Sequence, residues 1–144
     1  MISTELARAL RDSGLVWHPG SGDAFRIDRP EVDGDVFTVS EMTVEAYTHP
    51  TGTILGFNGT TEWALDSVDL EDALWLPRED QLRELLRGTF RSLTRHDEPG
   101  SMGFVVHAVI KGESVFFAGE DAADAYGRAL LSLIDFSADI SIEE

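Results

Sequence analysis

The apolar side chains of the chain recur every three or four residues in three segments and every two residues in the segments between them. A spacing of three or four residues places apolar side chains on one face of a helix. The three helical segments are 2–10, 82–93 and 122–133. Ser3 or Thr4 is placed to cap the first helix, and Gly14 is placed to end it.

The limits of the second and third helices are predicted from the residues at the helix ends. Pro77 suits the first turn of a helix, where its missing N–H leaves no hydrogen bond unmade. Gly88 is a candidate end for this helix, but the apolar stripe continues past it, so an interrupted helix that runs to about Arg95 is expected. The last helix follows Asp121. The residues after it, 137–144, are predicted to form an acidic and partly frayed tail.

Alternating apolar and polar residues predict strands between the first two helices. Residues 37–39 alternate in one phase, whereas residues 42–46 alternate in the other. Because a shift of one residue turns each side chain to the opposite face, a bulge or a tight turn is expected at Ser40-Glu41. A shorter strand is expected at "FRID", residues 25–28. The segment "VDLEDALWLP", residues 68–77, is expected to be a connection to the second helix.

Hairpins are predicted from their turn residues. Asn58-Gly59 favours a two-residue type I′ turn, and it separates "TILGF" from "TTEWAL". Pro and Gly in "HPTG", residues 49–52, indicate the turn before that hairpin. A C-terminal hairpin is expected over residues 104–119, with its turn at Lys111 to Ser114. The segment before it, "HDEPGSMG" at 96–103, is expected to be a loop.

These elements together predict the fold class. Strands joined by short turns form an antiparallel sheet, and helices that alternate with such strands cover one face of it. The sequence therefore predicts an α+β fold: a two-layer antiparallel sheet (meander plus C-terminal hairpin) with about three helices packed on one face. A length of 144 residues suits one domain. We expect a single globular α+β domain over residues 1–136, followed by the acidic tail 137–144.

Charge is the strongest signal in the composition. The chain has 27 Asp and Glu against 11 Lys and Arg, a net charge of −16. Lysine and arginine neutralise phosphates, so neither nucleic acid nor an anionic membrane is an expected partner. An acidic surface keeps a protein soluble, and it also attracts a basic protein. The chain has no cysteine, no apolar run as long as a membrane span and no secretory signal pattern, so a cytoplasmic protein is expected.

No spacing of chemically active residues points to a cofactor or a metal. The four histidines, His18, His49, His96 and His107, are not spaced as a metal-binding pair. "PGSGDAF", residues 19–25, is rich in glycine but lacks the spacing and the lysine of a phosphate loop. The dinucleotide pattern Gly-x-Gly-x-x-Gly is also absent. We therefore predict no catalytic residue, no cofactor and no metal site from motifs.

Three tryptophans and two histidines are candidates for function. Trp17, Trp63 and Trp75 are core residues by default, but tryptophan is also frequent at the centre of protein interfaces, so all three are candidates for a partner surface. His18 and His49 each precede a proline in a predicted loop. There either histidine, with a nearby Asp or Glu, would form an acid–base pair.

Two hypotheses of function follow. The first is a non-catalytic protein-interaction or regulatory domain of unknown pathway, whose partner is another protein or a second copy in a homodimer. The alternative is a small enzyme with a loop-built His/carboxylate acid–base site. The acidity and the lack of a catalytic spacing favour the first.

Four phrases resemble a group of small, acidic actinobacterial proteins of unestablished function: "DVFTVSEMTVEAY", "LGFNGTTEWALDSV", "DALWLPREDQLRELL" and "DAADAYGRALL". The resemblance covers most of the chain. Some members carry the label of pilus-assembly proteins of the CpaE type, which resemble the MinD/ParA ATPases. Those ATPases depend on a phosphate loop, and this chain has no such loop, so no catalytic residue is carried over. A second resemblance, of fold alone, is to the SUKH class of immunity and adaptor domains.

Overall fold

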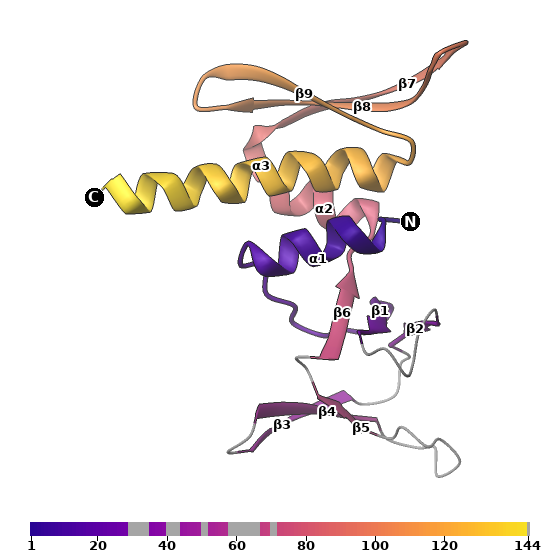
Figure 1. Ribbon diagram of the computed structural model, residues 1–144, viewed down its shortest axis with the longest axis vertical. Coiled ribbons are helices and arrows are strands. Elements are labelled where there is room, and N and C mark those ends of the chain that lie inside the picture. Colours follow the sequence, from indigo (N-terminus) through magenta and orange to yellow (C-terminus); the bar gives the residue numbers. More distant parts are fainter. Residues whose placement is uncertain (29–34, 40–43, 50–51, 58–66, 70–71, 144) are drawn as a thin grey trace. The chain divides into compact units, whose positions relative to one another are not determined.

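A computed structural model describes residues 1–28, 35–39, 44–49, 52–57, 67–69 and 72–143 (Figure 1). The contacts divide the chain into two compact units: unit 1 is Met1–Val16 with Pro77–Glu144, and unit 2 is Trp17–Leu76. Helices and antiparallel sheets occur together in the described ranges, so the predicted α+β class is confirmed. The assignment of residues 1–136 to a single domain stays a prediction.

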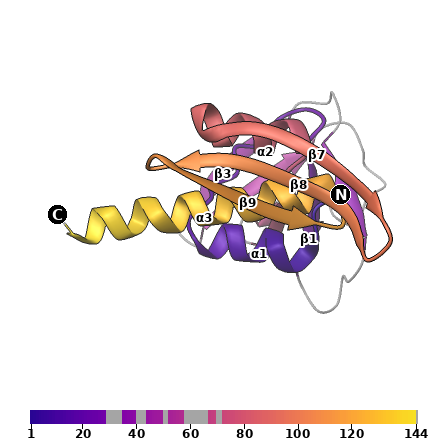
Figure 2. The same ribbon diagram turned by 90° about the horizontal axis from the view of Figure 1, so that it is seen from above.

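Unit 1 contains, within its described residues, one three-stranded antiparallel sheet and three α-helices. Its elements in chain order are α1 (Thr4–Asp12), α2 (Glu79–Leu86), a 3-10 helix (Arg87–Thr89), β7 (Phe90–Glu98), β8 (Ser101–Ile110), β9 (Glu113–Gly119) and α3 (Ala122–Glu143). The strands have the order β7-β8-β9. Helix α3 packs on β8 and β9, and α1 and α2 pack on α3, so the helices cover one face of the sheet (Figures 1 and 2).

The predicted ends of the first helix are confirmed. The Ser3 hydroxyl accepts a hydrogen bond from the Leu6 N–H at 3.3 Å, which caps the start of α1. At the other end, Gly14 adopts a φ of 113° and its N–H donates to the Arg11 carbonyl at 3.0 Å. Glycine reaches this left-handed conformation without a steric penalty, which is why it ends the helix here.

The first turns of α3 are buried on nearly every side. The buried residues are Ala122, Ala123, Ala125, Tyr126, Gly127, Ala129 and Leu130. Small side chains let the sheet and the other helices approach the α3 backbone closely. At Gly127, a Cβ would lie 2.7 Å from the Leu6 Cδ2 atom, so α1 crosses α3 where a side chain is absent. No helix in the described part of the chain is both long and apolar enough to cross a membrane.

The predicted C-terminal hairpin is confirmed. Strands β8 and β9 pair with Ile110 opposite Glu113, which leaves a two-residue turn at Lys111-Gly112. Both turn residues have positive φ, 52° and 79°, as a type I′ turn requires. This turn matches the twist of paired strands, and the local sequence therefore encodes the hairpin.

The prediction that the second helix runs to about Arg95 is wrong. Helix α2 ends at Leu86, and the chain continues through the 3-10 helix into β7. The segment predicted to be a loop, 96–103, is instead the tight turn of a β7–β8 hairpin, in which Glu98 lies opposite Ser101. Pairing with β8 outweighs the helical stripe here, and it is a contact that a local pattern does not contain.

The end of α3 also differs from the prediction. The backbone of residues 137–143 is helical, whereas the sequence was expected to leave this segment as a partly frayed tail. The helical spacing of apolar residues at 122–133 therefore marks the buried part of a longer helix.

Unit 2 contains two three-stranded antiparallel sheets within its described residues. Its strands are β1 (Ala24–Ile27), β2 (Val36–Thr38), β3 (Val44–His49), β4 (Gly52–Phe57), β5 (Ser67–Asp69) and β6 (Ala73–Leu76). The sheet orders are β2-β1-β6 and β3-β4-β5. Residues 68–77 were expected to be a connection. Most of β5 and all of β6 lie there instead, and β6 pairs with β1 so that Phe25 faces Trp75.

The register of the β4–β5 pair differs from the one that a turn at Asn58-Gly59 predicts. A two-residue turn there would place Trp63 opposite Ile54. In the structure Ile54 lies opposite Asp69, and Gly56 lies opposite Ser67. Asn58, Gly59 and Trp63 themselves lie outside the described residues, as does the bulge expected at residues 40–41.

We predict that Gly119→Ala destabilises unit 1. A Cβ at Gly119 would lie 2.6 Å from the Ala125 nitrogen and 2.9 Å from the Asp121 carbonyl oxygen. Both are backbone atoms at the start of α3, and they cannot rotate away as a side chain does. The free energy of unfolding, measured by urea denaturation, should fall by about 1–3 kcal/mol. The control is Gly88→Ala, which meets no atom within 4 Å, and an equal loss in both variants would contradict the prediction.

Candidate functional site

Trp17 is a core residue rather than part of a partner surface. Its side chain is 7% exposed, and its ring lies 5.4 Å from that of Phe25. The indole Nε1 donates a hydrogen bond to the Asp23 carboxylate at 2.9 Å, and the Gly20 N–H donates to the same oxygen at 3.0 Å. Asp23, 5% exposed, therefore closes the glycine-rich loop that begins at Pro19. A structural role explains both the tryptophan and the glycines.

The other two tryptophans have different outcomes. Trp75 is partly buried and packs against the cluster that contains Trp17 and Phe25. Its indole Nε1 is buried and has no hydrogen-bond acceptor in the described part of the chain. Trp75 therefore stays a candidate for partner contact. Trp63, the third candidate, lies outside the described residues.

The structure does not assemble the predicted acid–base pair in the ranges that it describes. His18 is exposed in unit 2, and His49 lies at the end of β3, where only its backbone is described. His96 and His107 belong to unit 1, on β7 and β8. Among the described residues, no group of three or more His, Asp or Glu side chains is placed to hold a metal ion.

Unit 1 has a hollow of about 520 Å³ beside the start of α3. Its charged or titratable lining residues are His96, Glu120, Asp124 and Arg128. Two of them make structural bonds, because Asp124 Oδ1 accepts from the Ser3 N–H at 2.8 Å and the Arg128 guanidinium donates to the Ala118 carbonyl. His96 and Glu120, both exposed, are the remaining pair with acid–base chemistry.

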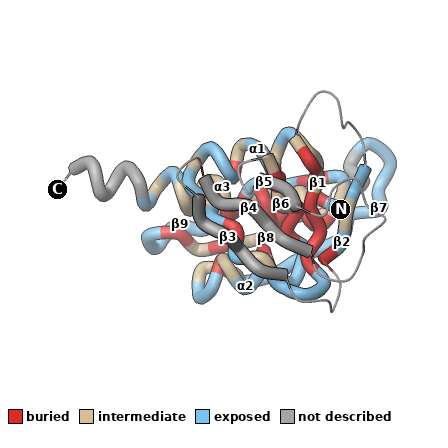
Figure 3. Tube along the Cα trace, turned by 90° about the horizontal axis from the view of Figure 1, so that it is seen from below, coloured by how far each residue is buried: buried red, intermediate tan, exposed pale blue. Residues whose placement is uncertain are grey.

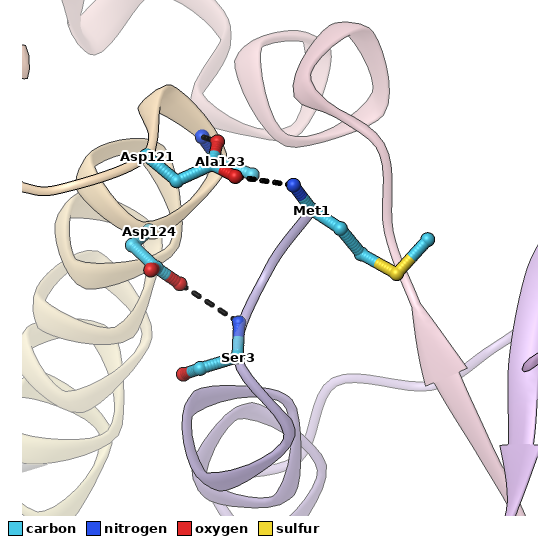
Figure 4. A network of polar contacts seen from close by, with 5 residues as sticks. All are labelled: Met1, Ser3, Asp121, Ala123 and Asp124. Atoms are coloured by element: carbon cyan, nitrogen blue, oxygen red, sulfur yellow. Dashed lines mark hydrogen bonds and ion pairs between the residues drawn. The ribbon is translucent and has the colours of Figure 1, made fainter. Parts of the chain in front are cut away.

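A polar network joins the start of the chain to the start of α3 (Figure 4). The Met1 ammonium forms an ion pair with Asp121, whose other carboxylate oxygen accepts from the Ala123 N–H at 3.0 Å. Burial alone would raise the pKa of the Asp121 carboxyl, but the ammonium and the Ala123 N–H outweigh it and hold that pKa below its usual range. Asp121 thus caps α3 and also anchors the segment before α1.

The face of the β7–β9 sheet that points away from the helices has an unusual composition. Its register places Ser92 and Phe116 on either side of His107. Val106 and Ala108 face the helices and are fully buried, so their neighbours along β8 face outward. The outer face around Phe116 consists of Ser92, Thr94, Val105, His107, Val109, Ser114 and Phe116, and the same alternation adds His96, Glu98 and Ala118. None of the residues around Phe116 is an acid, in a chain whose net charge is −16.

Phe116 is the most prominent side chain of the outer face. It is 65% exposed, and its ring stacks on that of His107 with centroids 4.6 Å apart and an interplanar angle of 10°. The Nε2 atom of His107 is buried and has no hydrogen-bond partner in the described residues. A large exposed aromatic ring is a feature that a bound partner would cover.

The sequence interpretation did not single out Phe116, although a signal was present. Val115, Phe116 and Phe117 are consecutive apolar residues in a predicted strand. Successive side chains of a strand point to opposite faces, so one member of such a run has to face away from the core. Size alone indicates the tryptophans as interface candidates, whereas this run of three apolar residues indicates the exposed apolar position.

Comparison of the chain with known protein families, with curated proteins and with solved structures found no match. The candidate site therefore rests on the geometry of the outer face and of the hollow. The resemblance to small acidic actinobacterial proteins stays a prediction.

We predict that Asp121→Asn lowers stability at pH 7 but not at low pH. The amide still accepts from the Ala123 N–H, so the variant removes the charge and keeps the cap. Because the folded-state pKa is lowered, the contribution is present above the unfolded-state pKa of about 3.9 and is lost as the pH falls through the folded-state value. Urea denaturation should show a loss of up to about 1 kcal/mol at pH 7, the range of exposed ion pairs.

The control for this prediction is Asp124→Asn, which removes a charge but keeps an acceptor for the Ser3 N–H. The loss in Asp121→Asn should vanish when unfolding is measured well below the usual aspartate pKa. A loss of equal size at both pH values would mean that the ion pair with the Met1 ammonium does not stabilise unit 1.

Proposed function

We propose that the protein is a non-catalytic protein-interaction domain and that the outer face of the β7–β9 sheet is its docking surface. The observation that carries the proposal is Phe116, an aromatic side chain that is 65% exposed on a sheet face with no helix over it (Figure 2). Aromatic side chains, phenylalanine among them, are enriched in protein interfaces. Val105 and Val109 supply an apolar surround on β8.

The charge of the outer face supports the same proposal. Interfaces are depleted of charged residues at their centre, because each buried charge has to be desolvated. The part of the outer face around Phe116 has no carboxylate, although 27 of 144 residues in the chain are acidic. A partner can therefore bury the surroundings of Phe116 without desolvating a charge.

The remaining charge indicates the kind of partner. Residues 17–76 contain 12 acidic residues and two arginines, so most of the net charge of the chain belongs to unit 2. A field of this sign accelerates the approach of a basic protein. We expect a partner with an apolar docking patch and a net positive charge.

The first test compares Phe116→Glu with Val16→Glu in affinity capture from the native cell followed by quantitative mass spectrometry. Val16 is also 65% exposed, but it lies after α1 and not on the sheet. Each variant adds one carboxylate at an exposed apolar position, so Val16→Glu shows the effect of a new surface charge away from the sheet. A true partner should be lost with Phe116→Glu and retained with Val16→Glu. Loss in both variants, or in neither, would count against the outer face.

The second test measures the association rate with the captured partner as the salt concentration rises. The Debye length is about 10 Å at 0.1 M salt, so added salt screens the attraction between an acidic chain and a basic protein. The association rate should fall steeply with salt, whereas the dissociation rate should change little. An association rate that does not change with salt would mean that the acidic surface does not contribute to recognition.

An enzyme is the second candidate, and the hollow beside α3 is the observation that favours it. His96 and Glu120 line the same hollow, and an imidazole with a carboxylate can transfer protons. The variant Glu120→Gln separates the two functions, because Glu120 follows β9 and does not lie on the outer face. It should leave partner capture unchanged if the domain acts by docking on the outer face, and it should abolish turnover if the hollow is an active site.

A further inference from the structure

Strand β7 is an open edge of the unit 1 sheet. The strand order is β7-β8-β9, and in the described residues β7 pairs with β8 alone. It is 9 residues long, and its residues from Arg91 to Glu98 are all exposed (Figure 3). Strands average about 5–6 residues, and edge strands are usually shorter, bulged or covered, because their unpaired backbone groups invite another strand.

From this edge we propose that the protein forms a two-fold homodimer in which β7 pairs antiparallel with β7 of a second copy. The two sheets then join into one six-stranded antiparallel sheet. The proposal does not rest on the docking function, because it uses the edge of the sheet and not its outer face. A two-fold interface brings the same surface together with itself, so the edge has to be complementary to itself.

The charges of β7 have this self-complementary order. Arg91 and Arg95 come first along the strand, and Asp97 and Glu98 come last. In an antiparallel pair each basic end therefore meets the acidic end of the other copy, and the strand as a whole is neutral. A parallel pair would set like charges side by side, which destabilises cross-strand neighbours.

The pleat and the charges of β7 limit the possible registers. Side chains alternate between faces, so residues directly opposite each other across a two-fold axis must both be odd-numbered or both be even-numbered. An axis at Thr94 brings Arg91 level with Asp97 of the second copy. Arg91 is the extra residue of the β7 bulge, so its side chain lies outside the strict alternation, and in the isolated chain its guanidinium donates to the Gly88 and Phe90 carbonyls. Moving the axis to Arg95 sets the two copies of Arg95 opposite each other. Moving it to Leu93 sets Arg91 level with Arg95. The axis at Thr94 alone avoids facing arginines among these three.

The same register makes use of Leu93. This side chain is 37% exposed on the helix-facing side of β7, and the Thr94 axis sets it opposite Arg95 of the second copy. The aliphatic stem of arginine covers apolar surface while its guanidinium stays in water. In the isolated chain the Arg95 guanidinium donates to the carboxylate of Asp97, two residues later, at 3.1 Å. Exposed ion pairs contribute little to stability, so contacts with a second copy can replace this one at little cost.

A single cysteine tests the register. The chain contains no cysteine, so Thr94→Cys adds the sole thiol. With the axis at residue 94 the two thiols face each other, and mild oxidation should give a disulfide-linked dimer on a non-reducing gel. The control is Ser92→Cys, whose two thiols would lie about 13 Å apart, beyond the ~7 Å limit of a disulfide. Equal cross-linking of both variants, or of neither, would overturn the Thr94 register.

Charge reversal tests the pairing itself. Light scattering of the wild-type chain should give twice the chain mass of 15.8 kDa. Arg91→Glu and Asp97→Arg should each weaken the dimer by about tenfold, because two attractive pairs become repulsive. Mixing the two variants should restore a heterodimer, since each reversed residue then meets an opposite charge. A wild type that stays at the mass of one chain at every concentration, or variants that do not recover on mixing, would overturn the proposal.

Discussion

The buried start of α3 is the constraint on which unit 1 depends. The sheet packs on one side of this helix and α1 and α2 pack on the others, so most of the surface of its first turns is buried, and Arg128 is the exposed residue there. A helix enclosed in this way has to be apolar over most of its surface, and it has to carry small residues where its neighbours come close. The alanines between 122 and 129, together with Gly127, meet both requirements.

One charged residue sets the position of this helix. Asp121 caps α3 through the Ala123 N–H and binds the Met1 ammonium, so the segment before α1 is tied to the start of α3. Gly119, two residues earlier, connects β9 to α3 at a point where a Cβ atom would clash with the backbone of Asp121 and Ala125. The end of β9 and the start of α3 are thus held together at Gly119, Asp121 and Ala123.

Placing all helices on one face of the sheet leaves two surfaces for recognition. The outer face carries Phe116 and has no charge around it, while the β7 edge is charged but balanced. Neither surface adds to the strong negative charge of the chain. A protein with a net charge of −16 repels its own copies and other acidic proteins, so its contact surfaces have to be the regions where that charge is absent. The two proposed interactions use different parts of one sheet, and a dimer would hold two outer faces for a single partner to bind.

The sequence by itself determined the features that local chemistry encodes. Ser3 and Gly14 bound the first helix, a run of alanines and leucines predicted α3, and the hairpin of residues 104–119 follows from alternation and a turn. The tertiary structure decided what depends on distant residues. Phe90 and Leu93 continue the helical stripe of residues 82–93 but lie in β7, because pairing with β8 supplies backbone hydrogen bonds that only the folded chain contains. Trp17 is buried because it packs on Phe25 and donates to Asp23, and Phe116 is exposed because no helix covers its side of the sheet. Neither outcome could be predicted from size or hydrophobicity, since each depends on which other elements cover the side chain.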